Sequence, residues 1–126
     1  MKVEVPLGEV VDKITILRIK AAQIHDAARR ANVLRELTTL EAAWAEEQGP
    51  VDRLAELPAL QDVNQRLWDV EDALRDLERA QRYDADFVAL ARSVYVLNDE
   101  RAAVKRQIND RLGSRLVEEK SYQPYR

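Results

Sequence analysis

The chain has 126 residues without a single cysteine, and its 20 basic and 23 acidic residues leave a net charge of -3. Disulfides and thiolate metal sites are therefore excluded, and the interspersed charges give no broad positive field for binding nucleic acid. No signal-peptide-like segment and no run of about 18 apolar residues occurs, so we expect one cytoplasmic domain over residues 1–126 that does not insert into a membrane.

The first half of the chain contains two helical patterns. Charged residues make up 34% of the sequence, and glycine and proline are few, which favours an all-α fold. Apolar residues at every third or fourth position predict helices over about 9–25 and about 27–48, with Asp26 as a suitable N-cap for the second. The first helix also carries Ile16 and Ile19 away from its main stripe, so we expect it to be covered on two sides.

The second half of the chain contains two longer helices. Pro58 can start a helix over about 59–82, and Asp84 or Asp86 can cap another over about 84–112. Apolar residues in both recur at helical spacing. Short connections imply antiparallel neighbours, so we predict an up-and-down bundle of three to four helices, of which the third and fourth are long.

The tail over residues 113–126 begins at Gly113, which is a stop signal for the fourth helix. A chain end of this kind is ordinarily disordered. Leu116, Val117, Tyr122 and Tyr125 give this one something to bury, so we predict that it is extended and packs back along the bundle. The side of the first helix away from its main stripe is a candidate surface for it.

A line of polar side chains follows the apolar stripe of the predicted fourth helix. At about 100° per residue, its members fall within a sector of roughly 80° that adjoins the apolar one. They are Asn98, Arg101, Lys105 and Asn109. These side chains form either a solvated flank, with long stems lying over apolar neighbours, or a semi-buried polar cluster.

A buried cluster requires partners for its cations, because an unpaired charge withdrawn from water costs several kcal/mol. Arg101 and Lys105 would then need acidic side chains or a small anionic ligand. Asp12 on the first helix and Glu71 on the third are the candidate counter-ions. Glu71 also has Arg75 four residues further on, a spacing that favours an ion pair within one helix.

Four segments form a recognisable set in a fixed order. They are GEVVDKITILRIK at 8–20, LWDVEDALR at 67–75, ARSVYVLNDERAAVKRQIN at 91–109 and VEEKSY at 117–122. Together they resemble a family of small bacterial proteins, a domain of unknown function. The resemblance implies a cytoplasmic, all-helical protein without an established activity, whose genes occur near those of sugar transferases or surface polysaccharides. The residues that match the family pattern, which are our candidates for the polar cluster or for ligand binding, are Asp12, Lys13, Glu71, Asp72, Asn98, Asp99, Arg101, Lys105, Asn109, Glu119, Lys120 and Tyr122.

Two functions of different classes fit these residues. The first is a non-enzymatic helical module that binds a protein partner or a small anionic ligand, and the second apolar side of the first helix favours a homodimer. The alternative is a cofactor-free enzyme of the chorismate mutase type, in which Arg101 and Lys105 would clamp a dianion. The segment VVDKITILRIK is similar to the helix that opens that fold.

Other chemistries lack the residues that they need. His25 is the only histidine, so a histidine-based triad or metal site cannot be built. The carboxylates of the third helix are spread around it and resemble a solvated surface. No glycine-rich loop precedes a helix, which excludes a phosphate cradle. We therefore predict neither a metal nor a cofactor.

Overall fold

The computed structural model describes all residues from 1 to 126. It contains four α-helices and a short 3-10 turn and no strand, which confirms the all-α prediction. The elements are α1 (Leu7–Gln23), α2 (Ala27–Gln48), the 3-10 turn η1 (Val51–Arg53), α3 (Leu57–Arg79) and α4 (Ala85–Leu112). None of the helices combines the length and the apolar character that crossing a membrane requires.

Two helices begin slightly earlier than the apolar pattern indicates. α1 begins at Leu7 instead of 9, directly after Pro6, and α3 begins at Leu57 instead of 59, with Pro58 in its first turn. A proline fits there because the first N–H groups of a helix have no partner within the helix. α1 ends at Gln23 instead of 25, since the next residue is extended, with φ -88° and ψ 122°.

The ends of the other helices follow the capping residues. The Asp26 carboxylate accepts a hydrogen bond from the backbone N–H of Arg29 at 2.9 Å, and α2 spans the predicted range. The Asp84 carboxylate likewise accepts from the backbone N–H groups at the start of α4. α3 ends at Arg79 instead of 82, and the chain turns at Gln81, whose φ is 53°.

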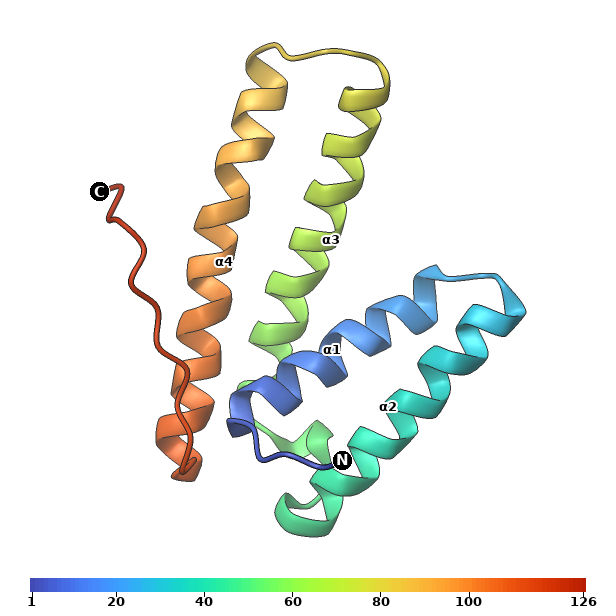
Figure 1. Cartoon of the computed structure of the whole chain (residues 1–126), viewed down its shortest axis with the longest axis vertical. Helices are drawn as coiled ribbons and strands as arrows, with labels where there is room; N and C mark the ends of the chain where they lie inside the picture. Colours follow the sequence, from blue (N-terminus) through green and yellow to red (C-terminus); the bar gives the residue numbers. More distant parts are fainter.

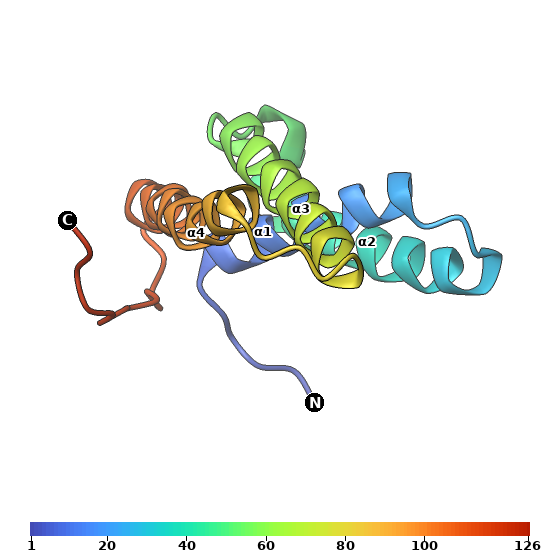
Figure 2. The same ribbon diagram turned by 90° about the horizontal axis from the view of Figure 1, so that it is seen from above.

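The helices form two antiparallel hairpins, α1–α2 and α3–α4, which are inclined to each other (Figure 1). α1 is the central element, because it packs against each of the other three helices, whereas α2 packs mainly against α1 and η1. Seen from above, α1 and α2 extend to one side of the α3–α4 hairpin (Figure 2). The chain turns from the first hairpin to the second after Gly49, whose φ of 82° only glycine adopts readily.

The hydrophobic core lies where α1 crosses α3 and α4. Ten buried apolar side chains form one cluster that extends from there to α2 and η1, and Ile14, Leu60 and Ile108 are completely buried. Beyond the crossing, the α3–α4 hairpin continues as two helices without a third (Figure 1), and no residue from 65 to 96 is buried. The α3–α4 hairpin is therefore densely covered at one end and open at the other.

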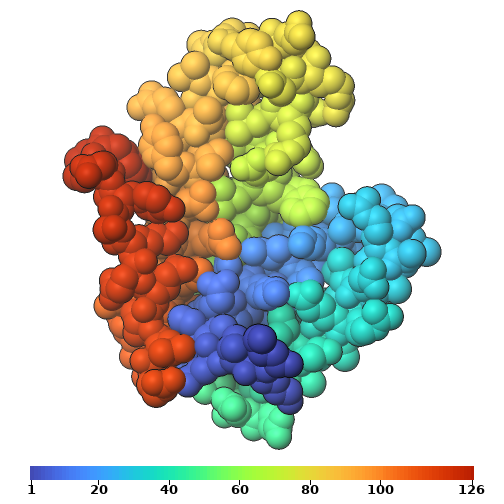
Figure 3. Space-filling model, in the orientation of Figure 1, coloured from blue at the N-terminus to red at the C-terminus, as the bar shows by residue number.

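The C-terminal tail, residues 113–126, folds back alongside α4 (Figures 1 and 3). The ring of Tyr125 meets that of Tyr95 of α4 edge-on, with 4.8 Å between centroids. The tail lies on α4 and not over Ile16 and Ile19, because the turn at the end of α4 returns the chain along the helix that it has just left. Those two isoleucines instead line a groove beside α3.

Candidate functional site

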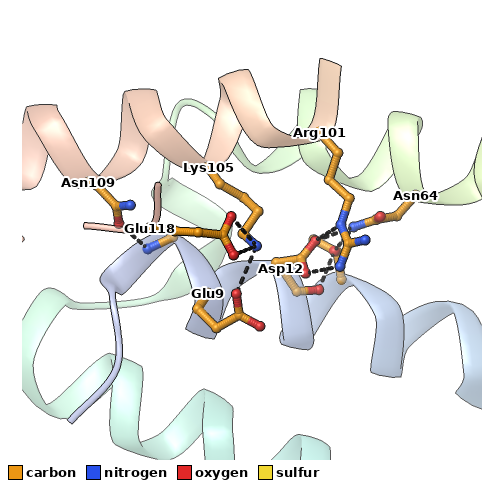
Figure 4. Close-up of polar contacts among 9 residues, drawn as sticks. Glu9, Asp12, Asn64, Arg101, Lys105, Asn109 and Glu118 are labelled. Carbon is orange, nitrogen blue, oxygen red and sulfur yellow. Dashed lines mark hydrogen bonds and ion pairs between the residues drawn. The ribbon is translucent and has the colours of Figure 1, made fainter. Parts of the chain in front are cut away.

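The polar line of α4 meets α1 where the two hairpins cross (Figure 4). Asp12 of α1 is 1% exposed, and Arg101 of α4 donates two hydrogen bonds to it, from Nε to Oδ1 at 2.8 Å and from Nη2 to Oδ2 at 2.5 Å. A guanidinium matches both oxygens of one carboxylate, which makes such a pair strong and directional. This pair holds α1 and α4 in register.

α3 joins the same carboxylate through the buried side chain of Asn64. Its Nδ2 donates to Asp12 Oδ1 at 2.9 Å and to Thr15 Oγ1 at 2.8 Å. Thr15 Oγ1 in turn donates to the backbone carbonyl of Asp12 at 2.7 Å. Every buried side-chain nitrogen or oxygen of the chain has a partner, so the network is fully satisfied.

One turn further along α4, Lys105 lies between two carboxylates. Its side chain is 8% exposed, and Nζ lies 2.7 Å from Oε2 of Glu9 on α1 and 3.3 Å from Oε1 of Glu118 in the tail. Together with the Asp12–Arg101 pair, the cluster contains three carboxylates and two cations. The cluster therefore carries a formal charge of about -1 and has no uncompensated positive charge.

The start of α1 is capped by groups from α4 and the tail. Pro6 offers no side-chain cap, and the backbone N–H of Gly8 instead donates to Oδ1 of Asn109 at 2.7 Å, while that of Leu7 donates to Oγ of Ser114 at 3.1 Å. These N–H groups have no partner within their own helix. Asn109, 2% exposed, thus fixes where α1 begins relative to α4.

The charges of the cluster stabilise one another. Burial raises the pKa of Asp12, but the hydrogen bonds from Arg101 and Asn64 and the charges of Arg101 and Lys105 outweigh it, so the pKa lies below its ordinary value of 3.8. Burial lowers the pKa of Lys105, yet Glu9, Asp12 and Glu118 outweigh it and raise the pKa above 10.5. Both groups are therefore charged at neutral pH.

The lowered pKa of Asp12 predicts a loss of stability in acid. A carboxyl whose pKa is lower in the folded than in the unfolded chain contributes stability above the unfolded value of 3.8, and this is lost as the pH falls through the folded pKa. We expect the free energy of unfolding, measured in urea from about pH 5 to about pH 2, to fall more in the wild type than in Asp12→Asn. Equal losses of unfolding free energy in the two proteins would show that ionisation of Asp12 does not stabilise the fold.

The model of a family of unknown function (DUF6165) matches residues 1–125. The chain belongs to this family. The resemblance of the four sequence segments is thereby confirmed, and the match covers α1 to α4 and all of the tail except its last residue. No curated protein and no solved structure matches the chain.

Four of the residues predicted from the sequence of this DUF6165 chain meet in the buried network. They are Asp12, Arg101, Lys105 and Asn109. From Arg101 to Asn109, the polar line of α4 is accordingly part of a buried cluster and not a solvated flank. Asn98, the remaining residue of the polar line, is half-buried beyond the end of the network and lines the open surface.

The remaining predicted residues lie outside the network. Lys13 pairs with Glu36 of α2 at 3.1 Å, and the Glu71 carboxylate accepts from Arg75 within α3 instead of from Arg101 or Lys105. Five others, on α3, on α4 and in the tail, are exposed: Asp72, Asp99, Glu119, Lys120 and Tyr122. Glu119 pairs with Arg106, and the ammonium of Lys120 lies 5.8 Å from the ring centroid of Tyr122.

Several members of the network were not among the sequence candidates. Asn64 could have been found, because it lies four residues after Leu60 and three before Leu67, in the apolar seam of α3. Glu118 has no such signal, since the tail has no periodicity that would place its side chains. The other unpredicted members are Gly8, Glu9, Thr15 and Ser114.

Two hollows lie next to the network, on the open part of the α3–α4 hairpin. The first, which we call the α3 groove, has a volume of about 480 Å³ and lies between α1, α3 and α4, lined by Ile16, Trp68 and Glu71 among others. The second, the tail groove, has about 870 Å³ and lies between α4 and the tail. Asn98 is the one residue that lines both hollows. No three carboxylate or imidazole side chains gather closely enough to hold a metal ion.

Proposed function

We propose that this DUF6165 protein is a non-enzymatic helical interaction module, which binds a helix of another protein chain on the open part of the α3–α4 hairpin, beside α1. The observation that supports the proposal is that α4 is buried beneath α1 along its second half and is not buried along its first half. Leu97 and Ile108 are buried beneath α1, whereas no residue from 65 to 96 is buried on either helix. A pair of helices that stands alone buries too little apolar surface, so a third helix is expected to complete it.

The open part has the composition of a helix-binding groove. Leu67 and Trp68 of α3 and Ile16 of α1 line the α3 groove, and Ala91 and Val94 of α4 continue the apolar surface into the tail groove. A groove of this kind accepts the apolar face of an amphipathic helix. α1 illustrates the fit, because it already packs against α3 and α4 on the covered part of the hairpin.

The buried network favours a protein partner over an anionic ligand. Arg101 and Lys105 are already hydrogen-bonded to carboxylates of the same chain. A dianionic substrate of the chorismate mutase type would have to displace Asp12, Glu9 and Glu118 and leave these three carboxylates, of which Asp12 is buried, unpaired near it. In this proposal the network is structural, and it holds α1 so that the groove keeps its shape. The association with sugar-transfer or surface-polysaccharide systems stays a prediction.

Site-specific photo-crosslinking in cells that contain the protein tests this function. A photoreactive phenylalanine analogue in place of Trp68 is expected to yield one discrete adduct, whose attached peptide, identified by mass spectrometry, belongs to an amphipathic helix. The matched control carries the analogue in place of Leu34, an exposed residue of α2 on the other hairpin. Absence of an adduct at position 68, or the same adducts at both positions, would contradict the proposal.

A further inference from the structure

Two charged side chains on the open surface of α3, Glu71 and Arg75, are complementary to the same pair on an antiparallel copy of the helix. Glu71 and Arg75 lie one turn apart on the same side of α3 as Trp68, and all three line the α3 groove. The side chains of Glu71 and Arg75 are 46% and 70% exposed and pair with each other within the helix. An acid followed one turn later by a base presents opposite charges to any copy of the same helix that runs in the opposite direction.

We infer that the helix bound on this surface is α3 of a second copy of the chain, so that the protein is a homodimer with antiparallel α3 helices. The inference rests on the function proposed above and names its partner. A two-fold axis between Glu71 and Arg75 places Glu71 of each copy opposite Arg75 of the other. A parallel arrangement would instead set like charges against each other, which is unfavourable.

The same axis accounts for the exposed apolar residues at the end of the hairpin. Antiparallel pairing about this axis brings the last turn of one α3 next to Trp68 of the other. The loop after it, which carries Tyr83 (56% exposed), and the first turn of α4, which carries Val88 (51% exposed), then lie near Ile16 in the groove of the other copy. Each hairpin end thereby fills the space beside α1 of the other copy, and the contact occurs twice.

Sedimentation velocity at micromolar concentration tests the inference. We expect a species of twice the 14.5 kDa mass of one chain. Glu71→Arg and Arg75→Glu should each raise the dissociation constant at least about tenfold, because like charges then meet across the axis. An equimolar mixture of the two variants should form a heterodimer, since every charge at position 71 of one chain then faces an opposite charge at position 75 of the other.

Two variants on the same helix serve as controls. Asp62→Arg and Arg66→Glu make the same changes of charge at exposed positions on the other side of α3, about 180° and about 140° around the helix from Glu71, so they should leave the dimer unchanged. Thermal melting followed by circular dichroism verifies that each variant is folded.

The possible results separate the inference from the proposed function. A wild type that sediments as a single chain overturns the inference. An adduct between position 68 and a different protein would then still support the proposed function. A dimer that Glu71→Arg and Arg75→Glu leave intact also overturns the inference, because its interface then lies elsewhere. Absence of any adduct at position 68 together with a single-chain species overturns both.

Discussion

Replacement of Arg101 by alanine is expected to lower the free energy of unfolding by about 3 kcal/mol, because it leaves the Asp12 carboxylate buried without its main partner. Asp12 is 1% exposed, and the two hydrogen bonds from Arg101 are its only contacts with a positively charged donor. Asn64 remains as a donor to one oxygen, so the protein should still fold. Chemical unfolding in urea at neutral pH measures the change.

The control for this variant is Arg66→Ala. Arg66 lies on the surface of α3, where its half-exposed side chain pairs with Glu100 of α4 at 3.2 Å. Exposed ion pairs contribute little, so this change should cost no more than about 1 kcal/mol. If Arg101→Ala stayed within about 0.5 kcal/mol of the wild type, the network would not hold the hairpins together.

A double-mutant cycle with Asp12→Ala assigns the effect to the pair. The double variant removes both charges at once and leaves no unpaired carboxylate behind. Its loss of stability should therefore be smaller than the sum of the two single losses, by at least about 1 kcal/mol. Strict additivity would mean that Arg101 acts through packing of its stem alone.

Replacement of Gly8 by alanine should destabilise the protein, by about 2 kcal/mol, although alanine is the better helix former. A Cβ atom at this position would lie 2.5 Å from the backbone carbonyl oxygen of Lys105 and 3.1 Å from Oδ1 of Asn109. The first of these neighbours is backbone, so α1 itself has to move away from α4. That movement also lengthens the 2.7 Å hydrogen bond between the Gly8 N–H and Asn109.

The sign of the change in stability caused by Gly8→Ala distinguishes the effect of close packing from that of helix propensity. Propensity alone predicts a gain of up to about 1 kcal/mol for glycine to alanine within a helix. Gly113→Ala is the comparison, because Gly113 has open space around its Cβ position and a φ of 66°, so only backbone strain of about 1 kcal/mol is expected. A more stable Gly8→Ala protein in thermal and urea unfolding would refute the close contact between α1 and α4.

Local rules accounted for which helices form and for the residues that cap α2 and α4. Asp26 and Asp84 cap α2 and α4 as their positions in the sequence predict, because a short side chain that binds the next N–H groups acts within a few residues of itself. The helical period also placed the polar line of α4 at the edge of the core. If that line is buried, Arg101 needs an acidic partner, and Asp12 was one of two candidates.

The choice between those candidates was made by the tertiary structure. Helical periodicity gives the direction of each side chain around its own axis, but not the height at which two helices cross or the angle between them. Because α1 crosses α3 and α4 at an incline, Asp12 reaches both Asn64 and Arg101, whereas Glu71 lies beyond the crossing and pairs within α3. The sequence by itself determined which helices form and which of their faces are polar; the packing of the two hairpins decided which charges are buried together and which part of α3–α4 stays open, since both depend on distances between residues far apart in the chain.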